Sequence, residues 1–344
     1  MPLFSATDRR AKGGTSARTP ANPGRARADA TWQNHGTCRL PGVLPGLRLS
    51  GTQDADAVVY AMVSTTTGRR HTVHFTAVGG EEWHGDGHEA DQLLARWRKS
   101  LRGLRDPTLL AAGLTLEMRT PRVLRLSLTY SDQQVDRKPD GRGKSRNRLH
   151  RMAAHLHNAL PKARKLLMEV SPTAVPMSAQ DLTYHVRKTF DPSIIDLVAG
   201  GAPLPVLRWK DVPPSRVREA WDHVVHDGAT SITWAMCGVA GESITPFLAT
   251  PNPLANGRIH VELRRPDASA RDSDFAPIML CTATSIEPTD KATPTLENFV
   301  AGLPQSTRWN LRRVYGGQAA AFTAGAGLGV DVPRQLLPPR GAKK

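Results

Sequence analysis

The feature that most constrains the fold is a long series of short segments in which apolar and polar residues alternate. In "RVLRLSLTYS" (122–131), Leu124, Leu126 and Leu128 alternate with polar residues, which predicts a strand with one apolar and one polar face. The other segments with strand patterns are 57–64, 71–78, 113–119, 230–236, 243–249, 258–265, 277–284 and 308–315. Because helices do not alternate strictly with these segments, we expect mostly antiparallel sheet and no doubly wound parallel sheet.

Helical patterns are fewer. Residues 89–104 place leucines and Trp97 on one face, and a second helix begins near Asn147, with Pro161 predicted to end or kink it. Ser178 followed by Asp181 predicts the start of a third helix, which reaches Phe190. Further helices are predicted at 296–303 and at the start of "GGQAAAFTAGAGLG" (316–329).

The segment "PPSRVREAWDHVVHDG" (213–228) has the density of histidines and acids that a metal or catalytic site would need. Its pattern instead predicts a helix that ends at Gly228 and whose core face is formed by Val217, Trp221, Val224 and Val225. His223 and His226 are three residues apart, but no third ligand accompanies them. We therefore expect this segment to form part of the core.

These patterns predict an α+β fold made of two units of mostly antiparallel sheet, with helices packed on one face. The predicted divisions are a disordered basic arm (1–31), a first domain (32–199), a Pro-rich linker (200–215), a second domain (216–334) and a disordered tail (335–344).

Charge and composition limit the classes of function. The 344 residues carry a formal net charge of +15, which favours an anionic partner such as nucleic acid, anionic lipid or an acidic protein surface. The three cysteines, Cys38, Cys237 and Cys281, are too scattered for a disulfide framework or a zinc site. No apolar run is long enough to span a bilayer, and the N-terminus lacks the apolar region of a secretory signal, so we expect a cytoplasmic chain.

No motif predicts a catalytic, cofactor-binding or metal site. "DGRGKS" (140–145) contains Gly-Lys-Ser, but Lys138 stands where a phosphate-binding loop requires its first glycine. His84 and His88 could bind zinc only from a shared helical face, which Gly85 and Gly87 oppose. The prediction is a protein that is not an enzyme and has no cofactor.

Residues 137–165 form the most basic part of the chain, with ten Lys or Arg residues and a single acid, Asp140. They could contact phosphates in a salt-dependent manner, although the stretch lacks aromatic residues that would stack on bases. A solvated face or an acidic protein partner are the alternatives. The candidate anion or partner contacts are Arg142, Lys144, Arg146, Arg148, Arg151, Lys162, Arg164 and Lys165.

Several segments, in this order, resemble an actinobacterial family of proteins associated with conjugative type IV secretion. They are "RLPGVLPGLRL" (39–49), "TFDPS" (189–193), "AWDHVVHDGATSITWAM" (220–236) and "VYGGQAAAFTAGAGLGV" (314–330). A weaker similarity, in the glycine-rich ending, is to the type VII secretion core component that has a cytosolic domain.

The resemblance implies a structural or adaptor component of a DNA-transfer apparatus, encoded beside the secretion ATPase and acting through protein–protein contacts. Members of the family usually carry a hydrophobic membrane hairpin ahead of this region, whereas residues 1–31 here are basic and polar. We therefore expect a peripheral protein at the cytoplasmic face of the membrane, bound to the secretion ATPase, to a membrane subunit, or to anionic lipid through the basic arm. The alternative function is a DNA-binding accessory protein that uses the arm and residues 137–165.

Overall fold

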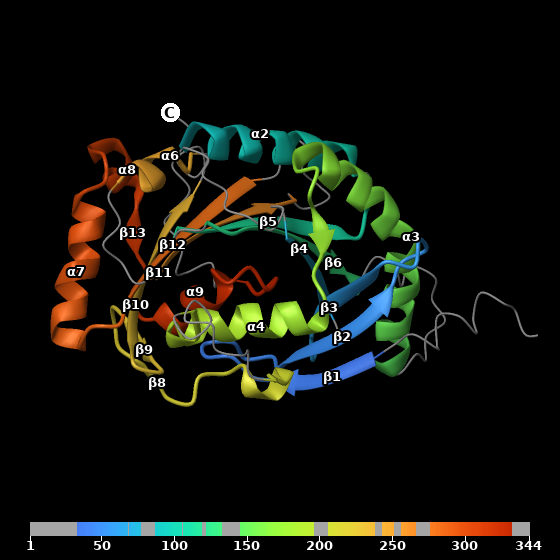
Figure 1. Cartoon of the computed structure of the whole chain (residues 1–344), viewed down its shortest axis with the longest axis horizontal. Helices are drawn as coiled ribbons and strands as arrows, with labels where there is room; N and C mark the ends of the chain where they lie inside the picture. The colour runs from blue at the N-terminus through green and yellow to red at the C-terminus, as the bar shows by residue number, and fades with distance from the viewer. Residues whose placement is uncertain are drawn as a thin grey trace, which may run out of the picture.

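The structure is a computed structural model that describes residues 33–67, 69–76, 87–104, 106–118, 122–132, 145–195, 206–237, 243–250, 256–265 and 276–331. The predicted basic arm (1–31) and tail (335–344) lie outside these residues. The α+β class is confirmed, because helices surround a strongly curved sheet of thirteen strands (Figure 1). Every strand pair in the described part of the chain is antiparallel.

The strands are β1 (Gln33–Cys38), β2 (Leu47–Gln53), β3 (Val59–Thr65), β4 (Arg70–Thr76), β5 (Leu109–Glu117), β6 (Leu124–Ser131), β7 (Val175–Pro176), β8 (Val217–Glu219), β9 (Val224–His226), β10 (Ala229–Cys237), β11 (Asn256–Arg264), β12 (Ala276–Ser285) and β13 (Arg312–Arg313). The helices are α2 (Gly87–Gly103), α3 (Ser145–Val170), α4 (Ala179–Phe190), the 3-10 turn η2 (Trp209–Asp211), α6 (Thr245–Ala249), α7 (Thr289–Ala301), α8 (Gln305–Asn310) and α9 (Gln318–Ala324).

The sheet contains the same arrangement twice. Its order is β1-β2-β3-β4-β6-β5-β11-β12-β10-β9-β8, so β5, β6 and β4 follow one another outward from the centre on one side, and β11, β12 and β10 on the other. Along the chain, each half begins with a hairpin (β3–β4 or β9–β10) and a helix (α2 or α6). Two neighbouring strands (β5–β6 or β11–β12) and another helix (α3 or α7) follow. A short strand paired with β4 or β10 and a last helix (α4 or α9) complete each half. The structure therefore contains an internal repeat, in which the two halves have the same order of elements and the same strand pairing.

The two halves share one sheet. β5 of the first half pairs with β11 of the second, with Glu117 opposite Arg258 and Ala111 opposite Arg264. A single apolar cluster also takes Leu126 from one half and Met279 from the other. The sequence-based picture of two separate sheets therefore needs correction.

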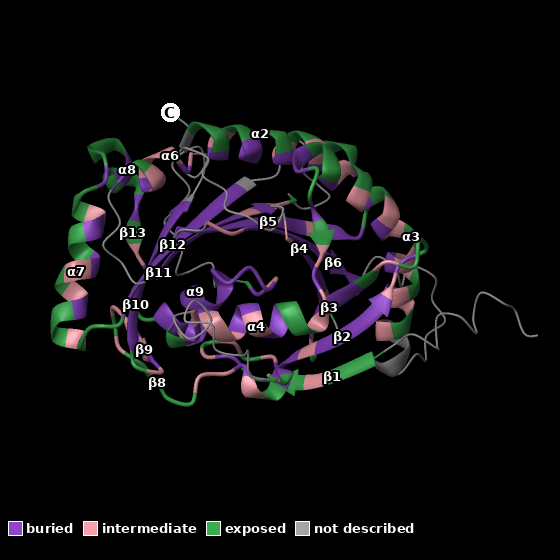
Figure 2. Cartoon of the chain, in the orientation of Figure 1, coloured by how far each residue is buried: buried purple, intermediate pink, exposed green. Residues whose placement is uncertain are grey.

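Helices pack on both faces of the sheet, which corrects the predicted single face. In β3, Tyr60 and Met62 belong to the apolar cluster beneath α2 and α3, whereas Ala61 and Val63 belong to a second cluster with α4 and α9. Figure 1 shows α4 and α9 inside the concave face and α2 and α3 outside it. Figure 2 shows that the central strands are almost entirely buried, as expected for a sheet covered on both faces.

The predicted linker is partly structured. Trp209 in η2 is buried, and its indole Nε1 donates a hydrogen bond to the carbonyl oxygen of Leu47 at 2.8 Å. A buried tryptophan contributes a large apolar area and usually satisfies its N–H in this way. Trp209 therefore holds η2 against β2, and the predicted linker residues 200–205 lie outside the described residues.

Some local predictions are confirmed and others are wrong. Ser178 and Asp181 form the expected capping box of α4, while α3 continues through Pro161. Residues 243–249 were predicted as a strand but contain α6, whose first backbone N–H groups donate to the carboxylate of Asp91 in α2. Residues 308–315 were also predicted as a strand. They contain the end of α8, and only the two residues of β13 are in a strand. In the described residues, no helix is both long and apolar enough to cross a membrane.

The glycine strap (325–331), which follows α9, crosses the concave face of the sheet. A Cβ atom added to Gly327 would lie 2.7 Å from Thr115 Oγ1, and one added to Gly329 would lie 1.9 Å from Thr72 Oγ1. Both glycines have positive φ angles, +75° and +71°. The alternating glycines therefore let the backbone rest directly on the sheet.

Candidate functional site

Residues 216–228, which the sequence predicted to be a helix, form a β-hairpin in which β8 pairs with β9. Asp227 and Gly228 then connect β9 to β10, with φ angles of 38° and 83°. Positive φ at both central positions defines the tight turn for which Asp-Gly is a strong signal. Gly228 is therefore a turn residue and not the end of a helix, and Trp221, in the β8–β9 turn, is 71% exposed instead of buried.

An aromatic stack lies on the surface and consists of Trp221, in the β8–β9 turn, and Tyr315. The ring centroids are 6.3 Å apart with an interplanar angle of 25°, and half of Tyr315 is exposed. Gly316 has a φ of +69° and donates its backbone N–H to the carbonyl oxygen of Trp221 at 2.7 Å. A Cβ atom at Gly316 would lie 2.6 Å from the indole, so glycine is needed for the ring to sit this close.

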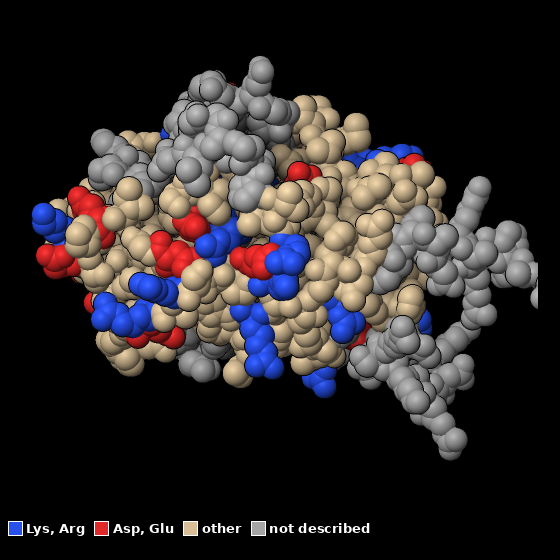
Figure 3. Space-filling model, turned by 60° about the horizontal axis from the view of Figure 1, so that its bottom comes forward, with Lys and Arg blue, Asp and Glu red and all other residues tan. Residues whose placement is uncertain are grey.

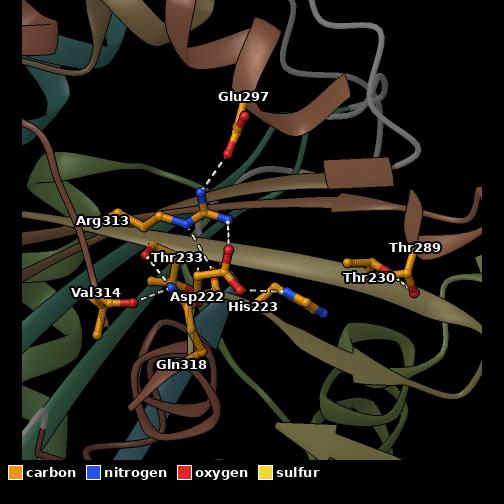
Figure 4. A network of polar contacts seen from close by, with 9 residues as sticks. All are labelled: Asp222, His223, Thr230, Thr233, Thr289, Glu297, Arg313, Val314 and Gln318. Carbon is orange, nitrogen blue, oxygen red and sulfur yellow. Dashed lines mark hydrogen bonds and ion pairs between the residues drawn. The ribbon is translucent and has the colours of Figure 1, made fainter. Parts of the chain in front are cut away.

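Arg313 joins the β8–β9 turn to α7 (Figure 4). Its Nε donates to the carbonyl oxygen of Asp222 at 2.9 Å, and its Nη1 donates to Glu297 Oε1 of α7 at 2.6 Å. The guanidinium carbon also lies 5.9 Å from the centroid of the Tyr315 ring. His223 Nδ1 contacts the Asp222 carboxylate at 2.8 Å. The β8–β9 turn, β13 and α7 are thereby held together around the two rings.

The Gln318 side chain is bonded to the edge of β10 (Figure 4). This fully buried side chain accepts a hydrogen bond from the Thr233 backbone N–H at 2.8 Å and donates to the Thr233 carbonyl oxygen at 3.1 Å and to that of Val314. The amide thus fills the gap in the ladder between the parts of β10 that pair with β9 and β13. The segment that carries Tyr315 is therefore fixed to the central sheet.

A second candidate is the inner polar layer, the polar side chains buried between the concave face of the sheet and α4. At its centre, Glu117 Oε1 accepts a hydrogen bond from Arg125 Nη1 at 2.7 Å, and Oε2 accepts one from Lys188 Nζ at 2.9 Å. Arg125 Nη1 also donates to His185 Nδ1 of α4 at 2.6 Å. The charged and imidazole side chains of the layer are His74, Glu117, Arg125, His185, Lys188, Arg258 and His260.

Burial and the local cations shift the ionisation of this layer. Burial alone would raise the pKa of Glu117, but Lys188 and Arg125 outweigh it and hold the pKa at about 2. Burial, followed by the charge of Arg125 on His74 and of Arg258 on His260, lowers the pKa of each of these histidines to about 3. The carboxylate is therefore ionised and the histidines are neutral at physiological pH.

The described residues hold no catalytic constellation. Both oxygens of Glu117 are occupied, and burial raises the pKa values of the Cys38 and Cys281 thiols to about 12, so neither is a ready nucleophile. The described part of the chain also contains no group of three or more histidines, cysteines or acids placed to hold a metal ion. Most of the sequence candidates near residues 81–91 and 140–145 lie outside the described residues.

The predicted basic contacts on α3 are only partly available. Lys162 and Lys165 are exposed, but Arg164 is bound to Asp54 at 2.9 Å and to Asp56 at 2.6 Å, where it ties α3 to the turn before β3. Arg151 is half-buried and makes a contact of its own. Arg142 and Lys144 lie outside the described residues, and so do the side chains of Arg146 and Arg148.

Comparisons of this chain with models of protein families and with curated proteins find no match. Function is therefore inferred from the sequence resemblance together with the geometry of the aromatic stack.

Proposed function

We propose that this protein is a non-enzymatic adaptor or structural subunit of a conjugative type IV secretion apparatus, and that it binds another protein subunit of that apparatus through the aromatic stack. The observation that carries the proposal is the exposure of Trp221 and Tyr315 on a rigid support. We place the protein at the cytoplasmic face of the membrane, held there by a membrane subunit or by the secretion ATPase.

The stack has the properties of a protein-binding surface. Tryptophan and tyrosine are the residues that most often dominate binding energy at interfaces. Because the Arg313 network and Gly316 already fix both rings, little conformational entropy would be lost on binding. Val217 of β8, which is 48% exposed, adds apolar surface from the same hairpin. The partner surface that fits this geometry is an apolar pocket with polar groups at its rim.

DNA binding is the second candidate and has less support. Arg164 is bound to two aspartates, which removes one cation from the predicted stripe on α3. Figure 3 shows one face of the molecule on which Lys and Arg side chains are interspersed with Asp and Glu. A DNA-binding surface would show an affinity that falls steeply with salt, and a flat dependence of affinity on salt would exclude it.

The change Trp221→Ala should weaken the complex with the partner subunit by at least tenfold, since loss of a central aromatic contact costs about 2 kcal/mol or more. The measurement is co-purification from cells expressing the secretion gene cluster, followed by titration of the purified secretion ATPase and membrane subunit. Trp309→Ala is the matched control, because Trp309 is 66% exposed but belongs to α8 and not to the stack. The proposal fails if neither subunit binds the wild-type chain, or if Trp221→Ala and Trp309→Ala bind equally well.

A further inference from the structure

The inner polar layer contains more buried positive charge than negative charge. Arg125, Arg258 and Lys188 all act on Glu117, whose two carboxylate oxygens are already bound to Arg125 and Lys188. Arg258 donates to the Phe322 carbonyl oxygen at 3.0 Å and lies 4.9 Å from the Phe322 ring, so its contacts are to neutral groups. Buried charge without a counterion is strongly unfavourable.

Hydrogen-bond donors in the same layer lack acceptors. Arg125 Nη2 and Arg258 Nε are buried and make no hydrogen bond. The His185 ring adds a third donor. Its Nδ1 accepts a hydrogen bond from Arg125, since a guanidinium can only donate, and the neutral ring must therefore carry its proton on Nε2. This Nε2 is also buried without a partner.

These side chains come from neighbouring elements around one region. His74 on β4 and Arg125 on β6 occupy adjacent pairs on the concave face, where His74 is opposite Ser127 and Arg125 is opposite Thr76. Arg258 on β11 is opposite Glu117 on β5, and Arg125 is hydrogen-bonded both to Glu117 and to His185 of α4, so these side chains surround one region. The Nε2 atom of His74 is likewise buried and unpartnered.

We propose that Arg125, Arg258, His185 and His74 bind a small inorganic anion beneath α4. Such an anion would offset the excess positive charge and would accept hydrogen bonds from the three donors that have no acceptor within the protein. Because α4 contributes His185 and Lys188, the anion would also join this helix to strands from both halves of the sheet. The site differs from the aromatic stack, so its existence is independent of the proposed function.

Thermal unfolding at constant ionic strength tests the proposal, with chloride or inorganic phosphate exchanged for a bulky organic anion. Chloride, phosphate or both should raise the melting temperature in a saturable manner, by about 3–5 °C at a hundredfold excess over Kd. Saturation by chloride alone would identify a halide site, and saturation by phosphate alone would identify an oxyanion site. Arg258→Met should abolish the effect, whereas Arg308→Met, which changes an exposed arginine of α8, should retain it.

A direct measurement covers the case in which Arg258→Met does not fold. Crystals of the wild-type chain soaked in bromide, or grown in phosphate, should show the anion within hydrogen-bonding distance of Arg125 and Arg258. The proposal is overturned if water molecules satisfy these donors in such crystals, or if all the salts shift the melting temperature equally and Arg258→Met does not change the shift.

Discussion

Acidification from pH 7 to pH 5 is expected to lower the free energy of unfolding by on the order of 5 kcal/mol or more. The groups responsible are four buried histidines, of which His74 and His260 have pKa values of about 3 and His226 a value of about 4. The fourth, His185, has a pKa well below the ordinary value of 6.5. Burial is the first cause in all four, and the positive charges of Arg125 or Arg258 add to it.

The direction follows from proton uptake. An unfolded chain protonates each histidine near pH 6.5, whereas burial keeps His74, His226 and His260 neutral at pH 5 and lowers the pKa of His185 well below its ordinary value. The unfolded state therefore binds more protons in this window, so stability is present above pH 6.5 and is lost as the pH falls below it. Each histidine contributes about 2 kcal/mol between pH 7 and pH 5. Urea unfolding at half-unit pH intervals measures the loss.

Single substitutions measure how much each histidine contributes to the loss of stability at low pH. His260→Gln should reduce the acid-dependent loss by about a quarter, whereas His88→Gln, which changes an exposed histidine of α2, should leave it unchanged. If the free energy of unfolding stays flat between pH 7 and pH 5, the histidines are not neutral in the folded protein. The layer would then have a different charge from the one described above.

Sequence patterns were sufficient where one local interaction determines the structure. The capping box at Ser178 and Asp181 uses residues three apart, and it is present as predicted. The alternation in 122–131 likewise predicted β6. The same alternation could not predict that the polar face is buried. Arg125 and Thr129 are covered by residues that come much later in the chain.

The predictions that failed depend on distant contacts or on competing local signals. Residues 245–249 become helical because Asp91, far away in the sequence, accepts hydrogen bonds from their first backbone N–H groups. In 213–228, helical spacing of apolar residues outweighed the Asp227-Gly228 turn signal, although that dipeptide precedes an alternating strand and could have revealed the hairpin. Trp221 was consequently assigned to the core, and the aromatic stack was missed.

The internal repeat also could not be predicted from patterns. Corresponding helices differ greatly in length, since α3 has 26 residues and α7 has 13, while α2 has 17 and α6 has five. What the halves share is the order of pairing around β5 and β11, and pairing partners are not visible in a single sequence.

Gly329→Ala is expected to destabilise the protein by about 2–5 kcal/mol. The backbone at Gly329 has a φ of +71°, which costs an alanine about 1–2 kcal/mol. The added methyl would also lie 1.9 Å from Thr72 Oγ1 and 2.8 Å from Thr129 Oγ1, so the strap or the sheet must move. Overpacking of a well-packed region typically costs a further 1–3 kcal/mol. The measurement is the urea midpoint at pH 7.

Gly228→Ala separates the two contributions. Its φ is +83°, similar to that of Gly329, but an added Cβ would meet nothing within 4 Å. It should therefore show only the backbone cost of about 1–2 kcal/mol. If the two substitutions prove equally destabilising, the glycine strap does not rest on the sheet as described. A larger loss at Gly329 would establish that contact between the strap and the threonines of β4 and β6 is what requires glycine there.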